Sequence, residues 1–152
     1  MNLRTLVVLT VFALPLFAAS KTAEIVIFTL DVKTEIPPQD RDRTDSRFFH
    51  GMAILSSEHA SDRQLQHMLC ELAEDAKRSG HKPAVRDGEF GVRLHKNGEA
   101  TQDLLVCFRQ CRSPLFIVIG KSDREVGLAP DQVRVLREAI DRLVKQRSRA
   151  RS

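Results

Sequence analysis

The sequence predicts an α/β domain in which helices pack on a β-sheet. Short apolar runs rich in β-branched residues recur along the chain, and two amphipathic helical patterns alternate with them. The chain has 152 residues, of which 42% are hydrophobic, enough to build one core. We therefore expect a single globular α/β domain over residues 21–147, preceded by a signal peptide over 1–20 and followed by a basic tail over 148–152.

Residues 1–20 are typical of a secretory signal peptide. A basic start at Arg4 precedes an apolar run from Leu6 to Phe17, and small residues follow up to Ser20. A membrane anchor would need about 20 apolar residues, whereas this run is shorter and contains Pro15. We expect cleavage after Ser20 and export, to the periplasm if the source is bacterial.

Two strands are predicted in the first half of the domain. The segment "AEIVIFTLDV" (23–32) is rich in β-branched residues, and "FFHGMAILSS" (48–57) is a second apolar run. The polar segment between them, with Pro37 and Pro38 near its start, is predicted to be a loop.

A helix is predicted after residue 60. Ser61 and Gln64 have the spacing of a capping box, and Gly80 can end the helix in the left-handed conformation. Its apolar stripe is formed by Leu65, Met68, Leu69, Leu72 and Ala76. His67 and Cys70 point away from this stripe.

The next segment is ambiguous. Phe90, Val92 and Leu94 alternate with polar residues in a half-buried strand that leads to an Asn97-Gly98 turn. Residues 100–111 fit either a strand or a helix. As a strand they would place their apolar residues beside those of 90–94 after an odd-length loop, but on the opposite face after a two-residue turn. The strand face would hold Leu104, Val106 and Phe108, and the helix stripe Leu104, Cys107, Phe108 and Cys111.

The last part of the domain is clearer. Leu115–Ile119 is apolar at every position, as in a strand covered on both sides. A turn and the short strand "EVGL" follow, and Pro130 opens an amphipathic helix.

The segment "SPLFIVIGKSDREVGLAPDQVRVLREAIDRL" resembles the last third of thioredoxin-like domains, and "GMAILSS" before "SDRQLQHML" is similar to their first strand-helix unit. The "IGK" and "D-R-x-Q" segments are also similar to those of an exported bacterial family of unknown function. The resemblance, over about residues 48–147, implies a thioredoxin-like three-layer sandwich with a central mixed β-sheet. The alternative is an α+β fold, an antiparallel sheet with two covering helices.

The resemblance also implies what is missing. Thioredoxins carry Cys-x-x-Cys between the first strand and its helix, where the helix N-terminus lowers the thiol pKa. The corresponding stretch here, "SSEHASDR" (56–63), has no cysteine. Pro114 stands where the family often has a cis proline.

The three cysteines, Cys70, Cys107 and Cys111, support three interpretations: a structural disulfide, buried free thiols, or catalytic or metal chemistry. A bridge between Cys107 and Cys111 would require a turn at Arg109-Gln110, whereas one from Cys70 would join the first helix to the later segment.

A zinc site is the sharper alternative. His67 and Cys70 are three residues apart on one helix, and Cys107 and Cys111 could complete a Cys₃His set. If the chain is instead a binding domain without catalytic activity, we expect no cofactor.

Charge and composition limit the partners. The net charge is +4, and the end of the chain is strongly basic, with no acid among its last residues. The cations that could contact an anionic surface are Arg142, Lys145, Arg147, Arg149 and Arg151. We expect no nucleic-acid partner, because the chain contains no tyrosine or tryptophan and no aromatic residue in the tail. Any membrane contact would be transient and through this tail.

The sequence therefore favours a small exported domain that binds an envelope protein or a small ligand without catalysing a reaction. Two alternatives remain: a thiol-disulfide oxidoreductase that uses Cys107 or Cys111, and a Cys/His zinc-binding protein.

Overall fold

The computed structural model describes residues 24–32, 37–109 and 111–150; the predicted signal peptide and Arg151 lie outside them. Seven strands and two helices are found in this part of the chain. The strands are β1 (Glu24–Leu30), β2 (Phe48–Phe49), β3 (Met52–Ala60), β4 (Phe90–Lys96), β5 (Glu99–Cys107), β6 (Leu115–Ile119) and β7 (Arg124–Gly127). The helices are α1 (Arg63–Ser79) and α2 (Pro130–Ala150), and a short 3₁₀ helix, η1 (Pro38–Asp40), precedes β2.

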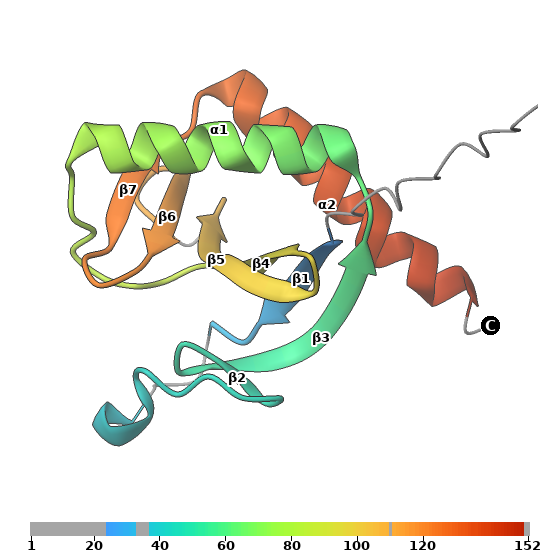
Figure 1. Ribbon diagram of the computed structural model, residues 1–152, viewed down its shortest axis with the longest axis horizontal. Helices are drawn as coiled ribbons and strands as arrows, with labels where there is room; N and C mark the ends of the chain where they lie inside the picture. Colours follow the sequence, from blue (N-terminus) through green and yellow to red (C-terminus); the bar gives the residue numbers. More distant parts are fainter. Residues whose placement is uncertain (1–23, 33–36, 110, 151–152) are drawn as a thin grey trace, which may run out of the picture.

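The strands form one sheet in the order β2-β3-β1-β4-β5-β6-β7, and every pairing between described strands is antiparallel. Both helices lie on one face, while β2 and η1 lie on the other side (Figure 1). The antiparallel sheet with two covering helices is therefore confirmed. The predicted mixed sheet does not form, because β1 separates β3 from β4, the two strands that the α1 crossover makes parallel to each other.

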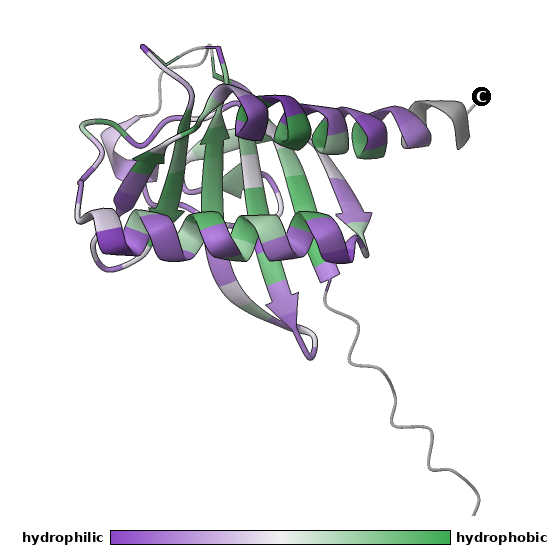
Figure 2. Cartoon of the chain, turned by 90° about the horizontal axis from the view of Figure 1, so that it is seen from above, coloured by the Kyte–Doolittle hydropathy of each residue, from purple (hydrophilic) through white to green (hydrophobic). Residues whose placement is uncertain are grey.

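Two apolar clusters lie on the two faces of the sheet. The larger lies under the helices, which cross the hydrophobic middle of the strands (Figure 2). It includes Ile25, Ile27, Leu65, Leu69, Val92, Leu104, Phe116, Leu136 and Ile140. The smaller lies on the helix-free face and consists of Leu30, Phe49, Met52, Leu105, Ile117 and Ile119, with Phe28 and Ile54 packed against it. The ring of Phe49 rests on Gly91, where a Cβ atom would come within 2.6 Å of the ring.

The predicted strand over 48–57 is wrong in its bounds. His50 and Gly51 have φ angles of 48° and 88°, which break the run into a tight hairpin between β2 and β3. β3 then continues to Ala60, so the stretch from Ser56 to Ala60 is strand, not the junction that sequence patterns suggested. An extra residue in β3 shifts its register against β1, since Thr29 pairs with Ser56 but Leu30 pairs with Ile54.

Residues 99–107 form a strand, which resolves the ambiguous segment. The two-residue Asn97-Gly98 turn alone would have put the apolar sets of β4 and β5 on opposite faces. A bulge corrects this: His95 pairs with Ala100, but Leu94 pairs with Gln102, which leaves Thr101 as the extra residue. Val92 and Leu94 of β4 therefore share the helix face with Leu104 and Val106 of β5, whereas Leu105 lies on the other face.

The helix predictions are largely confirmed. Gly80 ends α1 with a φ angle of 71°, and Pro130 begins α2. The N-cap of α1 is Asp62 rather than Ser61, because the Asp62 carboxylate accepts a hydrogen bond of 2.9 Å from the Leu65 amide. The peptide bond before Pro114 is trans. Among the described residues, no helix is both long enough and apolar enough to cross a membrane.

Candidate functional site: a charged groove on the helix-free face

An ion-pair cluster lies on the helix-free face of the sheet. Arg93 of β4 and Asp103 of β5 are cross-strand partners, and the guanidinium donates from Nε to Oδ1 and from Nη2 to Oδ2, each at 2.8 Å. His50, in the β2–β3 turn, contacts the same carboxylate through Nε2 at 2.7 Å. This carboxylate therefore ties the hairpin to the sheet.

The pKa of Asp103 reflects two opposing effects. Burial raises it, but hydrogen bonds from Arg93 and His50, together with their charges, outweigh burial and lower it from 3.8 to about 2. Asp103 is thus a fixed anion at any physiological pH.

A second ion-pair cluster is centred on Arg86, in the loop between α1 and β4. Its guanidinium donates from Nε and Nη2 to the Asp123 carboxylate at 2.8 and 3.2 Å, and from Nη1 to Asp42 at 2.8 Å. Asp123 also accepts from the Gly120 amide at 3.1 Å, which fixes it in the β6–β7 turn. Arg86 thus joins three segments that are far apart in the sequence.

A cavity of about 1080 Å³ lies between these segments, and a second hollow of about 470 Å³ shares Asp42, His50 and Arg86 with it. We call this continuous space the charged groove. Its polar lining is formed by Asp31, Arg41, Asp42, His50, Arg86, Asp87, Arg93, Thr101, Gln102, Asp103 and Asp123. A cavity of this size can hold a small organic molecule or a few residues of a peptide.

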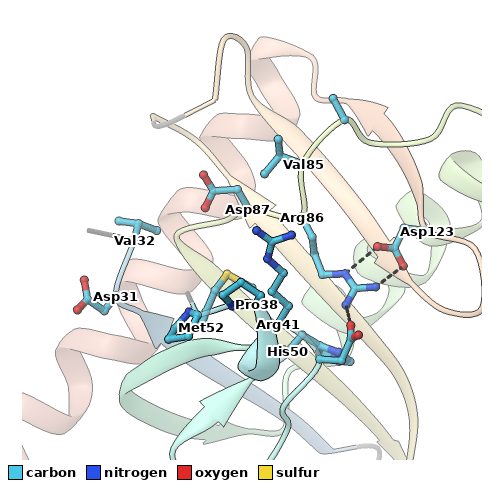
Figure 3. A pocket seen from close by; sticks show the side chains of 13 residues that line it. Asp31, Val32, Pro38, Arg41, His50, Met52, Val85, Arg86, Asp87 and Asp123 are labelled. Carbon is cyan, nitrogen blue, oxygen red and sulfur yellow. Dashed lines mark hydrogen bonds and ion pairs between the residues drawn. The ribbon is translucent and has the colours of Figure 1, made fainter. Parts of the chain in front are cut away.

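Arg41 lines the groove but belongs to neither of the two ion-pair clusters. Its side chain enters from the η1 side and Arg86 enters from the opposite wall (Figure 3). Arg41 is exposed and, within the described part of the chain, forms no ion pair. Pro38 and Met52 supply apolar surface in the same cavity. The groove therefore offers an exposed guanidinium beside walls that are joined by ion pairs and that also carry the carboxylates of Asp31 and Asp87.

Two cysteines are bonded to each other. Cys107 and Cys111 form a disulfide with Cα atoms 6.1 Å apart; Cys107 is buried and Cys111 is half-buried. Gln110, where we expected part of the turn, lies outside the described residues. The Glu89 carboxylate accepts from the amides of Phe108 and Arg109 at 2.7 and 3.2 Å, which holds the start of the bridged loop. The prediction of a disulfide is thus met by this pair.

The other predicted site residues are not brought together. Cys70 is a free, exposed thiol on α1, and His67 contacts Glu71 at 3.4 Å on the same helix. The described residues contain no group of three or more His, Cys, Asp or Glu that could hold a metal. The predicted Cys₃His zinc set is therefore not assembled, because two of its sulfurs are bonded to each other.

The basic residues at the end of the chain are placed in part. Arg142 and Lys145 are exposed on α2, and the backbone of Arg147 and Arg149 continues that helix. Residues 148–150 of the predicted tail are therefore helical.

The charged groove was not predicted from the sequence. Residues 90–94 were predicted as a half-buried strand from their apolar alternation, and Arg93 was not singled out. One signal was available: Arg93 and Asp103 both lie opposite the apolar face of two strands joined by an Asn97-Gly98 turn, which is the pattern of a cross-strand ion pair. No comparable signal places Arg41, His50 or Arg86, since their loops meet only in the folded chain.

Comparison with protein-family models, with curated proteins and with solved structures finds no match to this chain. The site must therefore be interpreted from its chemistry. Among the described residues that line the groove there is no serine or cysteine, the side chains that most often act as nucleophiles. Its arrangement suits binding.

Proposed function

We propose that the chain is an exported, non-enzymatic binding domain whose charged groove takes a carboxylate-bearing small ligand or segment of an envelope protein. The observation that carries this proposal is the free guanidinium of Arg41 in a cavity whose walls are held by two ion-pair clusters. A guanidinium binds a carboxylate through two parallel hydrogen bonds, and a pre-formed wall reduces the entropy lost on binding.

The thioredoxin-like relationship and export belong to the same proposal. The final β6–β7–α2 unit has the strand-strand-helix order on which the resemblance rests. The mass of the intact secreted protein tests export, with cleavage after Ser20 as the expected result and retention of residues 1–20 as the contrary one.

Binding can be tested by NMR with two probes, succinate and the peptide acetyl-Asp-Glu. We expect each to shift the amide signals of residues 39–42, 50–52 and 84–88 in the ¹⁵N-labelled protein. Arg41→Gln removes the charge but keeps a polar, exposed side chain, so the fold should be unchanged. A lost charge-assisted pair contributes about 1.5 to 3 kcal/mol, so the affinity should fall at least about tenfold.

Arg134→Gln is the matched control, because Arg134 is exposed on α2, away from the groove, and its ion pair within the described part of the chain is with Glu138 at 3.5 Å. It should bind both probes like the wild type. Signal changes confined to α1, or equal affinity of Arg41→Gln and the wild type, would show that the groove is not the site.

A thiol-disulfide oxidoreductase is the second candidate, favoured by the Cys107–Cys111 bridge with its half-buried Cys111. A substrate thiolate would attack Cys111 Sγ, and Cys107 would leave as a thiolate. A second substrate thiolate would then attack the mixed disulfide, so that the substrate is oxidised to a disulfide and the protein is reduced to a dithiol. The reverse reaction reduces a disulfide substrate.

Insulin reduction with dithiothreitol separates the two candidates. An oxidoreductase would accelerate insulin precipitation, would lose this activity in Cys107→Ser and Cys111→Ser, and would keep it in Cys70→Ser. The binding proposal predicts no acceleration by any of the four proteins.

A further inference from the structure

The charge of α2 changes along its length. The first part is balanced: Asp131 lies in the first turn, Arg134 contacts Glu138, and Asp141 is the last acid of the chain. After Asp141 every charged residue is a cation, namely Arg142, Lys145, Arg147, Arg149 and Arg151.

The same part of α2 leaves the body of the protein. Among the residues of α2 up to Gln146, whose side chains are described, the last fully buried one is Ile140, and Leu143 and Val144 pack partly against the core after it. The helix backbone continues to Ala150, past the edge of the sheet beside β3 (Figure 1). The backbone of α2 therefore extends beyond these core contacts.

A hollow beside the basic part of α2 carries charges of both signs. Arg142 and Leu143 line this hollow, of about 510 Å³, together with Arg63 at the start of α1. The Asp62 carboxylate also lines it and keeps its negative charge while it accepts a hydrogen bond from the Leu65 amide. The excess of positive charge therefore belongs to α2 after Asp141 and not to the start of α1.

The helix macrodipole accounts for only part of this pattern, the cations at positions 147 and 149 in the last turn. It favours cations in the last turn of a helix and falls off beyond that turn. Arg142 and Lys145 both lie more than one turn before Ala150.

We propose that the basic end of α2 docks on an anionic phospholipid bilayer. Clusters of four or more cations on one helix bind such surfaces, and each cation near the surface increases partitioning roughly fivefold. The absence of tyrosine and tryptophan from the chain disfavours single-stranded nucleic acid, whose bases stack on aromatic side chains. Docking uses the basic end of α2 and leaves the charged groove open.

Vesicle co-sedimentation tests the proposal with the mature full-length chain. The vesicles contain phosphatidylcholine alone or equal parts of phosphatidylcholine and phosphatidylglycerol. We expect binding to the anionic vesicles only, weakened by added salt because the interaction is electrostatic. Arg142→Glu combined with Lys145→Glu should reduce it at least about 25-fold, given roughly fivefold per cation lost.

Arg109→Glu combined with Arg112→Glu is the control, because it changes the net charge equally on exposed residues of the β5–β6 loop. It should bind nearly as well as the wild type, and circular dichroism should show equal helix content in all three proteins. A chain that ends at Val144 should also lose binding. Equal loss in both double variants, undiminished binding of the α2 variant, or binding to phosphatidylcholine alone would overturn the proposal.

Discussion

Single residues decide how the charged groove is held together, and Asp103 is the clearest case. Its carboxylate accepts from Arg93 on the neighbouring strand and contacts His50 in the β2–β3 turn. Because the Asp103 carboxylate joins three elements, protonation of this carboxylate should lower the free energy of unfolding of the whole domain.

We predict an acid-dependent loss of stability that depends on Asp103. Its pKa in the folded chain is about 2, below the ordinary 3.8, so the stabilisation is complete above pH 3.8 and is lost as the pH falls through about 2. The difference corresponds to about 2 kcal/mol. Urea unfolding as a function of pH should show this component in the wild type. Asp103→Asn should lack it, and an unchanged pH profile in that variant would contradict the assignment.

Gly91 is a second residue with a specific role. We predict that Gly91→Ala destabilises the domain by about 1 to 3 kcal/mol, because the added Cβ would lie 2.6 Å from the Phe49 ring and force it to move. Gly127→Ala, in β7, is the control, since its Cβ would meet no atom within 4 Å. Thermal unfolding of the two variants measures the difference; equal melting temperatures would show that Phe49 can move at no cost.

At the scale of elements, the bridged loop after β5 is the most testable. We predict that reduction of the Cys107–Cys111 disulfide lowers the free energy of unfolding by about 2 kcal/mol, the value expected for so short a closed loop. Urea unfolding with and without dithiothreitol measures it. The reductant should not change the urea midpoint of Cys111→Ala, whereas it should lower that of Cys70→Ser as in the wild type. A wild-type urea midpoint that stays the same on reduction would mean that Glu89 holds the loop without the bridge.

The sequence predicted elements well where one local signal dominates. Leu115–Ile119 is apolar throughout and forms β6 with these bounds, and the predicted Pro130 start and Gly80 stop of the helices are confirmed. It failed where distant contacts decide. The hairpin at His50 and Gly51 is held by the contact between His50 and Asp103, which are far apart in the sequence. The bulge at Thr101 brings the apolar sets of β4 and β5 to one face, where the core includes residues from other elements.

The site was harder to predict than the elements. Its residues come from η1, the β2–β3 turn, the loop before β4 and the β6–β7 turn, and no single segment carries a recognisable motif. Only Arg93 and Asp103 are related by a local rule, since they lie on two strands joined by one turn. Their partners, His50 among them, reach them only through long-range packing.

For the whole molecule, the two faces of the sheet should differ in stability. The helix face is closed by a continuous apolar cluster, whereas the other face relies on a smaller cluster and on ion pairs. We predict that Arg86→Met increases amide hydrogen exchange in residues 37–47 and 120–124 by about tenfold or more and leaves α1 unchanged, since it unties Asp42 and Asp123. Arg134→Met is the control and should alter neither segment. Faster exchange over the entire chain would mean that the groove is not an independent unit.

The position of β1 has a consequence for biosynthesis. It is the first described strand, yet both of its neighbours, β3 and β4, are made later, and the second of them only after the whole of α1. The emerging chain therefore cannot complete the middle of its sheet until residues near Lys96 have left the ribosome. Under the export proposed above, this late closure of the central ladder would help to keep the chain unfolded until it reaches a translocation channel.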